Sequence, residues 1–149
     1  MPAESEVPLP HTWRPLGVRM AATFFGGALF VVCAFAWFGF DESVRDRFTT
    51  SQRGTLIGLG LMTFALGHAL ARCRVVATEK GLVVVNGYRR REYEWAQVIA
   101  IRLPRGAPWA SLDLSDGTSV SVMGIHGSDG PRATTAVRQI RALVDRPQR

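Results

Sequence analysis

The densest group of charge in this 149-residue chain is a run of three arginines, Arg89, Arg90 and Arg91, with Lys80 on a predicted turn close to it. Guanidinium groups make paired, charge-assisted hydrogen bonds with phosphate, and basic side chains near a bilayer are attracted to anionic lipids. The four residues therefore predict a surface that contacts anionic lipid head groups or a protein partner. The alternative is a solvated edge strand, which its charges protect from pairing with another chain. Nucleic acid is not an expected partner, because no aromatic and basic stacking surface or reading helix is evident.

A second candidate site is the glycine-rich loop at residues 124–130, GIHGSDG, before a predicted helix. Backbone N–H groups at a helix N-terminus bind phosphate, but the loop lacks the spacing of a P-loop or of a dinucleotide fold. We expect instead a turn in which Ser128 or Asp129 caps the helix. His126, Ser128 and Asp129 are also the residue types of a catalytic triad, yet a triad draws its members from separated elements.

The remaining reactive side chains do not predict an enzyme. The sequence shows no carboxylate pair, nucleophile elbow or metal-ligand cluster, so we expect no catalysis, cofactor or metal. Cys33 and Cys73 have no metal-binding spacing and are expected to be inert thiols. His68 is the only ionisable group inside two apolar stretches of the chain, where such groups are functional candidates. Because it lies one turn from Arg72, we expect a structural role for it at the membrane interface.

Those two apolar stretches must position the candidate residues. Residues 20–40 carry no charge, and as a helix of 21 residues they would span roughly 31 Å, close to the thickness of a bilayer core. Residues 55–71 are also apolar, at the lower limit of length for a crossing. We predict a membrane hairpin over residues 16–72, with helices at about 18–40 and 54–72. A cleaved signal peptide is the alternative for the first stretch, but large apolar residues continue past its A-x-A pattern.

Small residues recur at helical spacing in both stretches, and such patterns let two helices approach closely in lipid. We predict that they pack the hairpin within the chain or join two copies of it as a homo-oligomer. The small residues concerned are Ala22, Thr23, Gly26, Gly27, Gly54, Gly58, Thr63, Gly67 and Ala71.

The distribution of charge predicts the orientation. Before Arg72 five arginines balance five acidic residues, whereas from Arg72 onward thirteen basic residues face seven acidic ones. Basic residues gather on the cytoplasmic side of membrane proteins. Both termini are therefore expected in the cytoplasm, and the link at residues 41–53 outside a multi-pass protein of the cell membrane. Residues 1–15 hold four prolines and predict a flexible tail, with Trp13 at the lipid interface.

From Cys73 onward the pattern changes to short β-type runs. Asn86 and Gly87 predict a two-residue type I′ turn, since both tolerate the positive φ that this turn requires. In the strand that follows, Arg89, Arg91, Tyr93 and Trp95 share one face, and we expect the two aromatic residues to face the core. The predicted strands are 74–77, 82–85, 88–95, 98–103, 110–114 and 119–123, and a helix with one apolar face follows from Pro131.

This order of strands and a closing helix, directly after a two-helix hairpin, resembles the bacterial pleckstrin-homology-like (PH-like) domain proteins found as small membrane proteins of actinobacteria. The resemblance implies a cytoplasmic, membrane-tethered α+β roll in residues 73–149, with an antiparallel sheet or partial barrel closed by one C-terminal helix. It brings no catalytic signature. The residues that carry it are Thr12-Trp13-Arg14-Pro15, 74–78 (RVVAT), Gly81-Leu82, Val84, Asn86, Trp95, Val98, Ile101, Leu112, Asp116-Gly117 and 136–143.

Two functional hypotheses follow from these patterns. The first is a non-enzymatic, membrane-anchored binding or scaffold module that recruits a protein or contacts anionic lipid at the cytoplasmic face. The second is a structural subunit, packed into a larger membrane complex through its glycine-rich hairpin.

Overall fold

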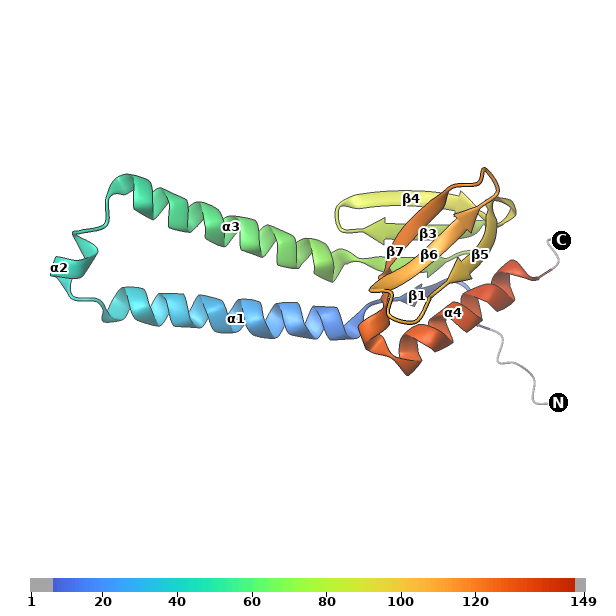
Figure 1. The fold of residues 1–149 in the computed structure, drawn as a ribbon, viewed down its shortest axis with the longest axis horizontal. Coiled ribbons are helices and arrows are strands. Elements are labelled where there is room, and N and C mark those ends of the chain that lie inside the picture. Colours follow the sequence, from blue (N-terminus) through green and yellow to red (C-terminus); the bar gives the residue numbers. More distant parts are fainter. Residues whose placement is uncertain (1–6, 147–149) are drawn as a thin grey trace.

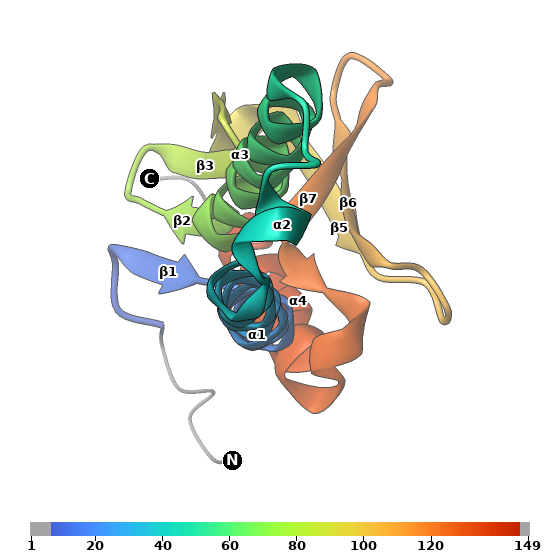
Figure 2. The ribbon, with the colours of Figure 1, turned by 90° about the vertical axis from the view of Figure 1, so that its left-hand side faces the viewer.

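The computed structural model describes residues 7–146, which form a long helical hairpin and a compact mixed domain (Figure 1). One strand, β1 (His11–Trp13), precedes the hairpin, and all the other strands follow it. The hairpin is therefore an insertion between the first two strands of the domain. Seen from the tip of the hairpin, both helices stand in front of the domain and project from the same side of it (Figure 2).

The hairpin consists of α1 (Leu16–Gly39) and α3 (Thr50–Arg72), with the single turn α2 (Glu42–Arg45) at its tip. Both long helices are long and apolar enough to cross a membrane, and no part of their apolar stretches is buried inside the protein. The predicted pair of helices is confirmed, although each begins earlier than predicted. The early start of α3 has a local cause, because Thr49 and Gln52 form a reciprocal capping box.

Aromatic side chains gather at the tip of the hairpin. The ring of Phe48 lies 5.8 Å from that of Trp37 and 6.4 Å from that of Phe40, measured between centroids. The guanidinium of Arg53 lies over Trp37, 5.7 Å from the ring centroid. Aromatic and basic side chains at one level are typical of a lipid–water interface.

The glycines of the hairpin do not pack its two helices together. A Cβ atom added at Gly26, Gly27, Gly54, Gly58 or Gly67 would meet nothing within 4 Å. The prediction of packing within the hairpin is therefore wrong for these five glycines, although parts of α1 and α3 approach to within 8 Å between Cα atoms. The faces of these glycines are open towards the surroundings of the hairpin.

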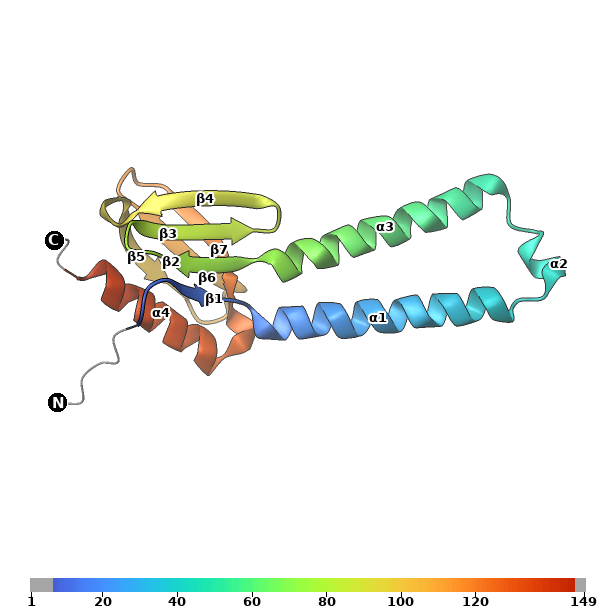
Figure 3. The same cartoon turned by 180° about the vertical axis from the view of Figure 1, so that it is seen from behind.

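Seven strands form two antiparallel sheets, ordered β1-β2-β3-β4 and β5-β6-β7. No strand pairing joins one sheet to the other among the described residues, so the fold is an open α+β roll rather than a closed barrel, with the last helix packed against it (Figure 3). The remaining elements are β2 (Arg74–Ala77), β3 (Gly81–Asn86), β4 (Arg89–Glu94), η1 (Trp95–Gln97), β5 (Val98–Arg102), β6 (Trp109–Leu114), β7 (Ser119–His126), η2 (Gly127–Asp129) and α4 (Pro131–Val144).

The two sheets meet where β7 crosses β2 and β3. A Cβ atom added at Gly124 would lie 2.6 Å from the carbonyl carbon of Arg74, so only glycine allows this crossing. Beside it the side chain of Asn86 acts as a bridge between the sheets. Its Nδ2 donates to the carbonyl oxygen of Ser121 at 2.6 Å, and its Oδ1 accepts from the N–H of Met123 at 3.0 Å.

That bridge explains why the predicted turn is displaced by one residue. The hairpin between β3 and β4 is confirmed, but Asn86 pairs with Arg89 inside the ladder and the loop consists of Gly87 and Tyr88. Gly87 has φ 64°, and no described residue other than glycine has a positive φ. Glycine at the first loop position is the pattern of a type II′ turn, so the type I′ prediction is wrong.

Residues 7–15 belong to the domain, which corrects the predicted boundary at residue 73. β1 pairs with β2 as the first strand of the larger sheet. Trp13 is buried in the core instead of lying at the lipid interface, and its Nε1 donates to Oε1 of Gln139 in α4 at 2.9 Å. The flexible tail predicted for residues 1–15 is therefore wrong for residues 11–13, while residues 1–6 lie outside the described part of the chain.

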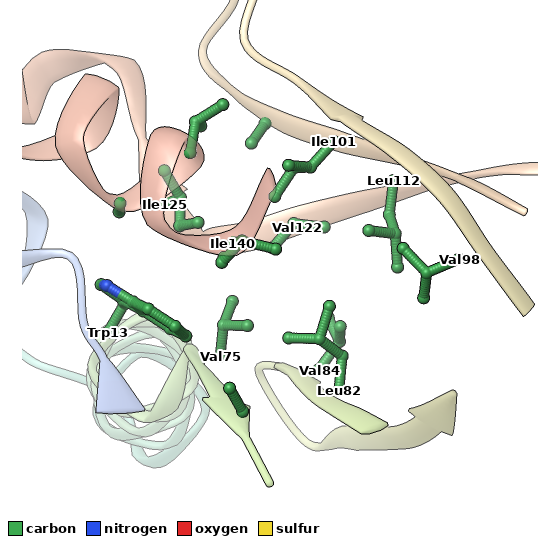
Figure 4. Close-up of a cluster of buried hydrophobic side chains, with 14 of the residues drawn as sticks. Trp13, Val75, Leu82, Val84, Val98, Ile101, Leu112, Val122, Ile125 and Ile140 are labelled. Carbon is green, nitrogen blue, oxygen red and sulfur yellow. The ribbon is translucent and has the colours of Figure 1, made fainter. Parts of the chain in front are cut away.

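One hydrophobic core fills the space between the two sheets and α4 (Figure 4). Tyr93 and Trp95 face this core as predicted, each 8% exposed. Trp95 does not end the strand, however, but begins the 3₁₀ turn η1, and its Nε1 donates to the carbonyl oxygen of Thr78 at 3.0 Å. The predicted apolar face of α4 is also buried.

Candidate functional site

Asp129 caps the first helix of the hairpin instead of the helix that follows it. Its two carboxylate oxygens accept from the N–H of Leu16 at 3.1 Å and from the N–H of Gly17 at 2.8 Å. The N-cap of α4 is Gly130, without a side-chain hydrogen bond, so the predicted cap by Ser128 or Asp129 is wrong. A carboxylate at a helix N-terminus satisfies free N–H groups and interacts favourably with the helix dipole.

The local sequence around α1 explains why the cap comes from so far away. Pro15, the N-cap residue of α1, makes no side-chain cap because it has no acceptor to offer. Gly17 leaves room for the distant carboxylate, since an added Cβ would lie 2.9 Å from Oδ1 of Asp129. The domain thus holds the start of α1 through one side chain.

Tyr88 fastens the domain to the end of α3. Its hydroxyl donates to the carbonyl oxygen of Ala65 at 3.0 Å and lies 3.0 Å from Nδ1 of His68. Because the phenol has one proton and gives it to Ala65, the imidazole must donate its Nδ1–H to the phenol oxygen. The guanidinium of Arg72 lies over the same ring, 5.6 Å from its centroid. The geometry gives His68 a structural contact at the domain end of the hairpin.

Cys73 completes this junction between α3 and the sheet. It is buried, its Sγ accepts from the N–H of Gly87 at 3.2 Å, and it lies 3.5 Å from the carbonyl oxygen of Ala69. Cys33 is exposed on α1, and both are free thiols. The pair therefore forms no disulfide in the described chain.

Strand β4 divides the arginine run between two faces. Arg91 pairs with Val84, which belongs to the hydrophobic core, and cross-strand partners share a face, so Arg89 and Arg91 lie on the inner side of the sheet. Arg90 lies on the outer side and pairs with Glu92 at 2.5 Å. All three arginine side chains remain exposed to solvent.

Lys80 is not brought to the arginines. It lies in the turn before β3, beside Gly81, which pairs with Glu94 at the end of the sheet opposite Arg89. The six residues of β3 separate the two ends, about 20 Å at 3.3 Å per residue. The predicted surface of four basic residues is therefore not formed, and Lys80 lies away from the hairpin.

A cleft of about 270 Å³ lies between β4 and β7, where the sheets are not joined. Neither Arg89 nor Arg91 has an ion-pair or hydrogen-bond partner among residues 7–146. The hydroxyl of Tyr93 is buried beside them and also lacks a partner within the described chain. The lining residues include no Asp or Glu: they are Val84, Asn86, Arg89, Arg91, Tyr93, Ser119, Val120 and Ser121.

Asp113 is the acidic residue linked to this cleft. It accepts a hydrogen bond from the hydroxyl of Ser119 at 3.0 Å and pairs with Arg102. The hydrogen bond from Arg102 lowers the pKa of Asp113 below its ordinary value; desolvation opposes this effect, and the hydrogen bond from Ser119 adds a smaller lowering. The charge of Asp113 is thus offset by Arg102, and the hydroxyl proton of Ser119 is already in use.

A second cleft, of about 390 Å³, lies between β1 and α4. Its lining includes Arg14, which precedes α1, and Arg132 in the first turn of α4, both exposed. The hydrogen bond between Trp13 and Gln139 closes part of it from within. This cleft adds two basic side chains to the end of the domain from which the helices emerge.

The glycine-rich loop contains a serine and histidine pair without the third member of a triad. Nδ1 of His126 lies 2.8 Å from Oγ of Ser128 and 3.3 Å from its backbone nitrogen, which closes a local turn. The carboxylate of Asp129 is turned towards α1, where it accepts from Leu16 and Gly17, and within the described residues it makes no hydrogen bond with His126. Across residues 7–146 no group of three His, Cys, Asp or Glu side chains could hold a metal ion.

Comparison with known proteins agrees with this architecture. Residues 72–143 match the bacterial PH domain family. The similarity to individual proteins extends over the hairpin as well, because three mycobacterial relatives are each 30% identical over 97% of this chain and 92% of their own length. The chain belongs to the bacterial PH domain family. The relatives are Rv1417 and MT1460 of Mycobacterium tuberculosis and Mb1452 of Mycobacterium bovis, each described as an uncharacterized protein. No solved structure matches the chain significantly.

Membership of the bacterial PH domain family indicates a binding or scaffold module. The two apolar helices indicate a membrane protein. In this chain no long linker separates the PH domain from the two helices. One residue separates α3 from β2, and two separate β1 from α1.

The sequence did not point to the residues that join this PH domain to its hairpin. Asp129 and Tyr88 act on partners far away along the chain, which no local pattern encodes. One signal was available for Asp129, since a helix that begins after a proline lacks a local side-chain cap. No comparable signal marked the unpaired hydroxyl of Tyr93.

Proposed function

We propose that this protein is a non-enzymatic, two-pass membrane protein whose PH domain is a binding module held against the cytoplasmic head groups. Its exposed arginines favour anionic lipid as the partner, with recruitment of a protein as the alternative. The observation that carries the proposal is the junction itself. Asp129 holds α1, while Tyr88 and Cys73 hold α3, so the orientation of the domain relative to the helices is constrained at two points.

Basic residues support a cytoplasmic placement of the domain. They lie at the ends of both helices where these enter the domain, and on the strand that follows the Tyr88 turn. Positive residues next to membrane helices are retained on the cytoplasmic side, and near the surface each contributes about 1 kcal/mol of attraction to anionic lipid. The residues at this end are Arg14, Arg19, Arg72, Arg74, Arg89 and Arg132.

Reporter fusions test the proposed topology. A reporter fused after Arg149 should be active only in its cytoplasmic form, and one inserted near Thr50 only in its exported form. The reverse pattern would remove the domain from the anionic inner leaflet and refute the proposed function.

Open glycine faces support the second candidate, a structural subunit of a larger membrane complex. A Cβ atom added at Gly26, Gly27, Gly54 or Gly58 would meet nothing within 4 Å, and glycine-rich faces let helices of different chains approach closely. Gly58→Leu should fit the isolated chain without a clash. If the glycine face packs against another chain, this variant should lose co-purifying proteins or self-association after gentle solubilisation, whereas Leu59→Val, at a position already occupied by a large side chain, should keep them.

A further inference from the structure

We propose that the cleft between β4 and β7 binds a phosphate group through Arg89 and Arg91. This inference deepens the proposed function, on which it rests for the idea that the domain recognises an anionic partner. It differs from a general attraction to anionic lipid because it assigns the recognition to one cleft and to two of the three neighbouring arginines.

The two arginines are arranged to hold one anion together. They are two residues apart on the same face of β4, so their Cα atoms are roughly 7 Å apart. Planar guanidinium groups at this spacing can each direct two N–H groups at one phosphate. No carboxylate lines the cleft within the described chain, so an anion from outside would supply the charge that the protein does not. Arg90 cannot take part, because it faces the other side and is paired with Glu92.

The remaining polar groups of the cleft are suited to an acceptor-rich ligand. Tyr93 is 8% exposed, and its buried hydroxyl has no hydrogen-bond partner in residues 7–146. A buried hydroxyl without a partner is costly, and the oxygen of a bound phosphate would satisfy it. The hydroxyl of Ser121 adds a further donor from β7, whereas that of Ser119 is already committed to Asp113.

The position of the cleft allows two sources for the phosphate. The Asn86 bridge closes its hairpin end, next to the turn in which Tyr88 contacts the last turns of α3. Arg89 therefore lies close to the level of the lipid head groups, and Arg91 lies farther from the membrane. With a volume of about 270 Å³, the cleft has room for a small head group or a soluble phosphate compound, below the usual range for drug-sized ligands.

Inward-facing charges have another established use, the protection of an edge strand from pairing with other chains. That role predicts that removing the charges causes aggregation. Edge protection alone predicts that variants without these charges bind phosphate like the wild type, as long as they remain monodisperse. The two roles can therefore be separated by experiment.

The test uses the full chain in nanodiscs and two probes. Inorganic phosphate is titrated onto protein in phosphatidylcholine nanodiscs, and binding is followed by ³¹P line broadening. In the second arm, nanodiscs contain a small fraction of phosphatidic acid, and the lipid that stays with the protein is measured by native mass spectrometry. Phosphate binding without lipid retention identifies a soluble ligand, and retention of phosphatidic acid identifies a head group; either result supports the cleft provided that the variants below reduce it.

The variants separate the cleft from the overall charge. Arg89→Gln and Arg91→Gln should each weaken phosphate binding about tenfold or more, since each removes charge-assisted hydrogen bonds. Arg90→Gln, from the same run but on the outer face, is the matched control and should leave binding within about twofold of the wild-type chain. Tyr93→Phe should weaken binding without lowering the melting temperature of the phosphate-free protein, because it removes a buried hydroxyl that has no partner there.

Equal losses in Arg89→Gln, Arg91→Gln and Arg90→Gln would show a response to net charge and overturn the cleft. So would the absence of phosphate binding and of lipid retention by wild-type protein. Neither result would alter the membrane topology, which the reporter fusions measure separately, so the proposal can fail while the proposed function stands.

Discussion

The contact between Asp129 and the start of α1 yields the sharpest test of the rigid junction. Asp129→Ala leaves the N–H groups of Leu16 and Gly17 without the two acceptors that they have at 3.1 and 2.8 Å. Loss of a capping side chain costs about 0.5–2 kcal/mol, and loss of a negative charge at a helix N-terminus about 0.3–1 kcal/mol. We therefore expect Asp129→Ala to lower the free energy of opening of the first turn of α1 by about 2 kcal/mol.

Hydrogen–deuterium exchange in nanodiscs measures this opening directly. A change of about 2 kcal/mol corresponds to roughly thirtyfold faster exchange at residues 16 and 17. Asp129→Asn keeps an acceptor but loses the charge, so its effect should lie between those of wild type and Asp129→Ala. Ser128→Ala is the matched control, since it changes the same loop but removes a hydroxyl that is bonded to His126 and not to α1. Unchanged exchange at residues 16 and 17 in Asp129→Ala would refute the cap and, with it, the constrained placement of α1.

Three further predictions concern the core, the second junction and pH. Trp95→Ala should lower the free energy of unfolding by about 3–5 kcal/mol, because it leaves a cavity in the core; an unchanged melting temperature would contradict the burial of Trp95. Tyr88→Phe should speed exchange in the last two turns of α3 while leaving α1 unaffected, since loss of the hydroxyl costs about 0.5–1.5 kcal/mol for each hydrogen bond; equal effects on both helices would argue against separate junctions. Asp113 has a lowered folded-state pKa, so its pairing with Arg102 stabilises the fold above the unfolded-state pKa and is lost as the pH falls through the folded-state value. Acidification below about pH 4 should thus lower the melting temperature of wild type more than that of Asp113→Asn, and parallel curves would show that the pair does not contribute.

The sequence predicted correctly those parts of the fold in which a periodic pattern extends over many consecutive residues. Two uninterrupted apolar stretches identify the helices by length alone. The apolar face of α4 repeats over four turns, and the alternation of β4 places Tyr93 and its neighbouring arginines on the correct face. In each case the signal is carried by residues that lie close together in the chain.

The errors share a different cause, which is that the deciding partner is distant. β1 has three residues, too few to show a period, and its pairing partner follows the whole hairpin. Asn86 looks like a turn residue, but its amide is held by β7, so the turn moves to Gly87 and Tyr88. Asp129 is placed in the sequence like a cap of α4, which follows it. Its carboxylate instead accepts hydrogen bonds from the N–H groups at the start of α1, which have no local side-chain cap.

The insertion of the hairpin between β1 and β2 has a mechanical consequence. These two strands are hydrogen-bonded neighbours, so α1 and α3 leave the domain from adjacent points of one sheet. Adjacent strands lie about 4.8 Å apart, whereas packed helices need about 8–10 Å, and the helices must therefore diverge from the point at which they leave the sheet. A third contact, from Tyr88 in the loop between β3 and β4 to α3, resists rotation of the domain about that point. The β4–β7 cleft borders the same turn. One face of the domain is thus held towards the hairpin, and the arginines of the cleft lie beside that face.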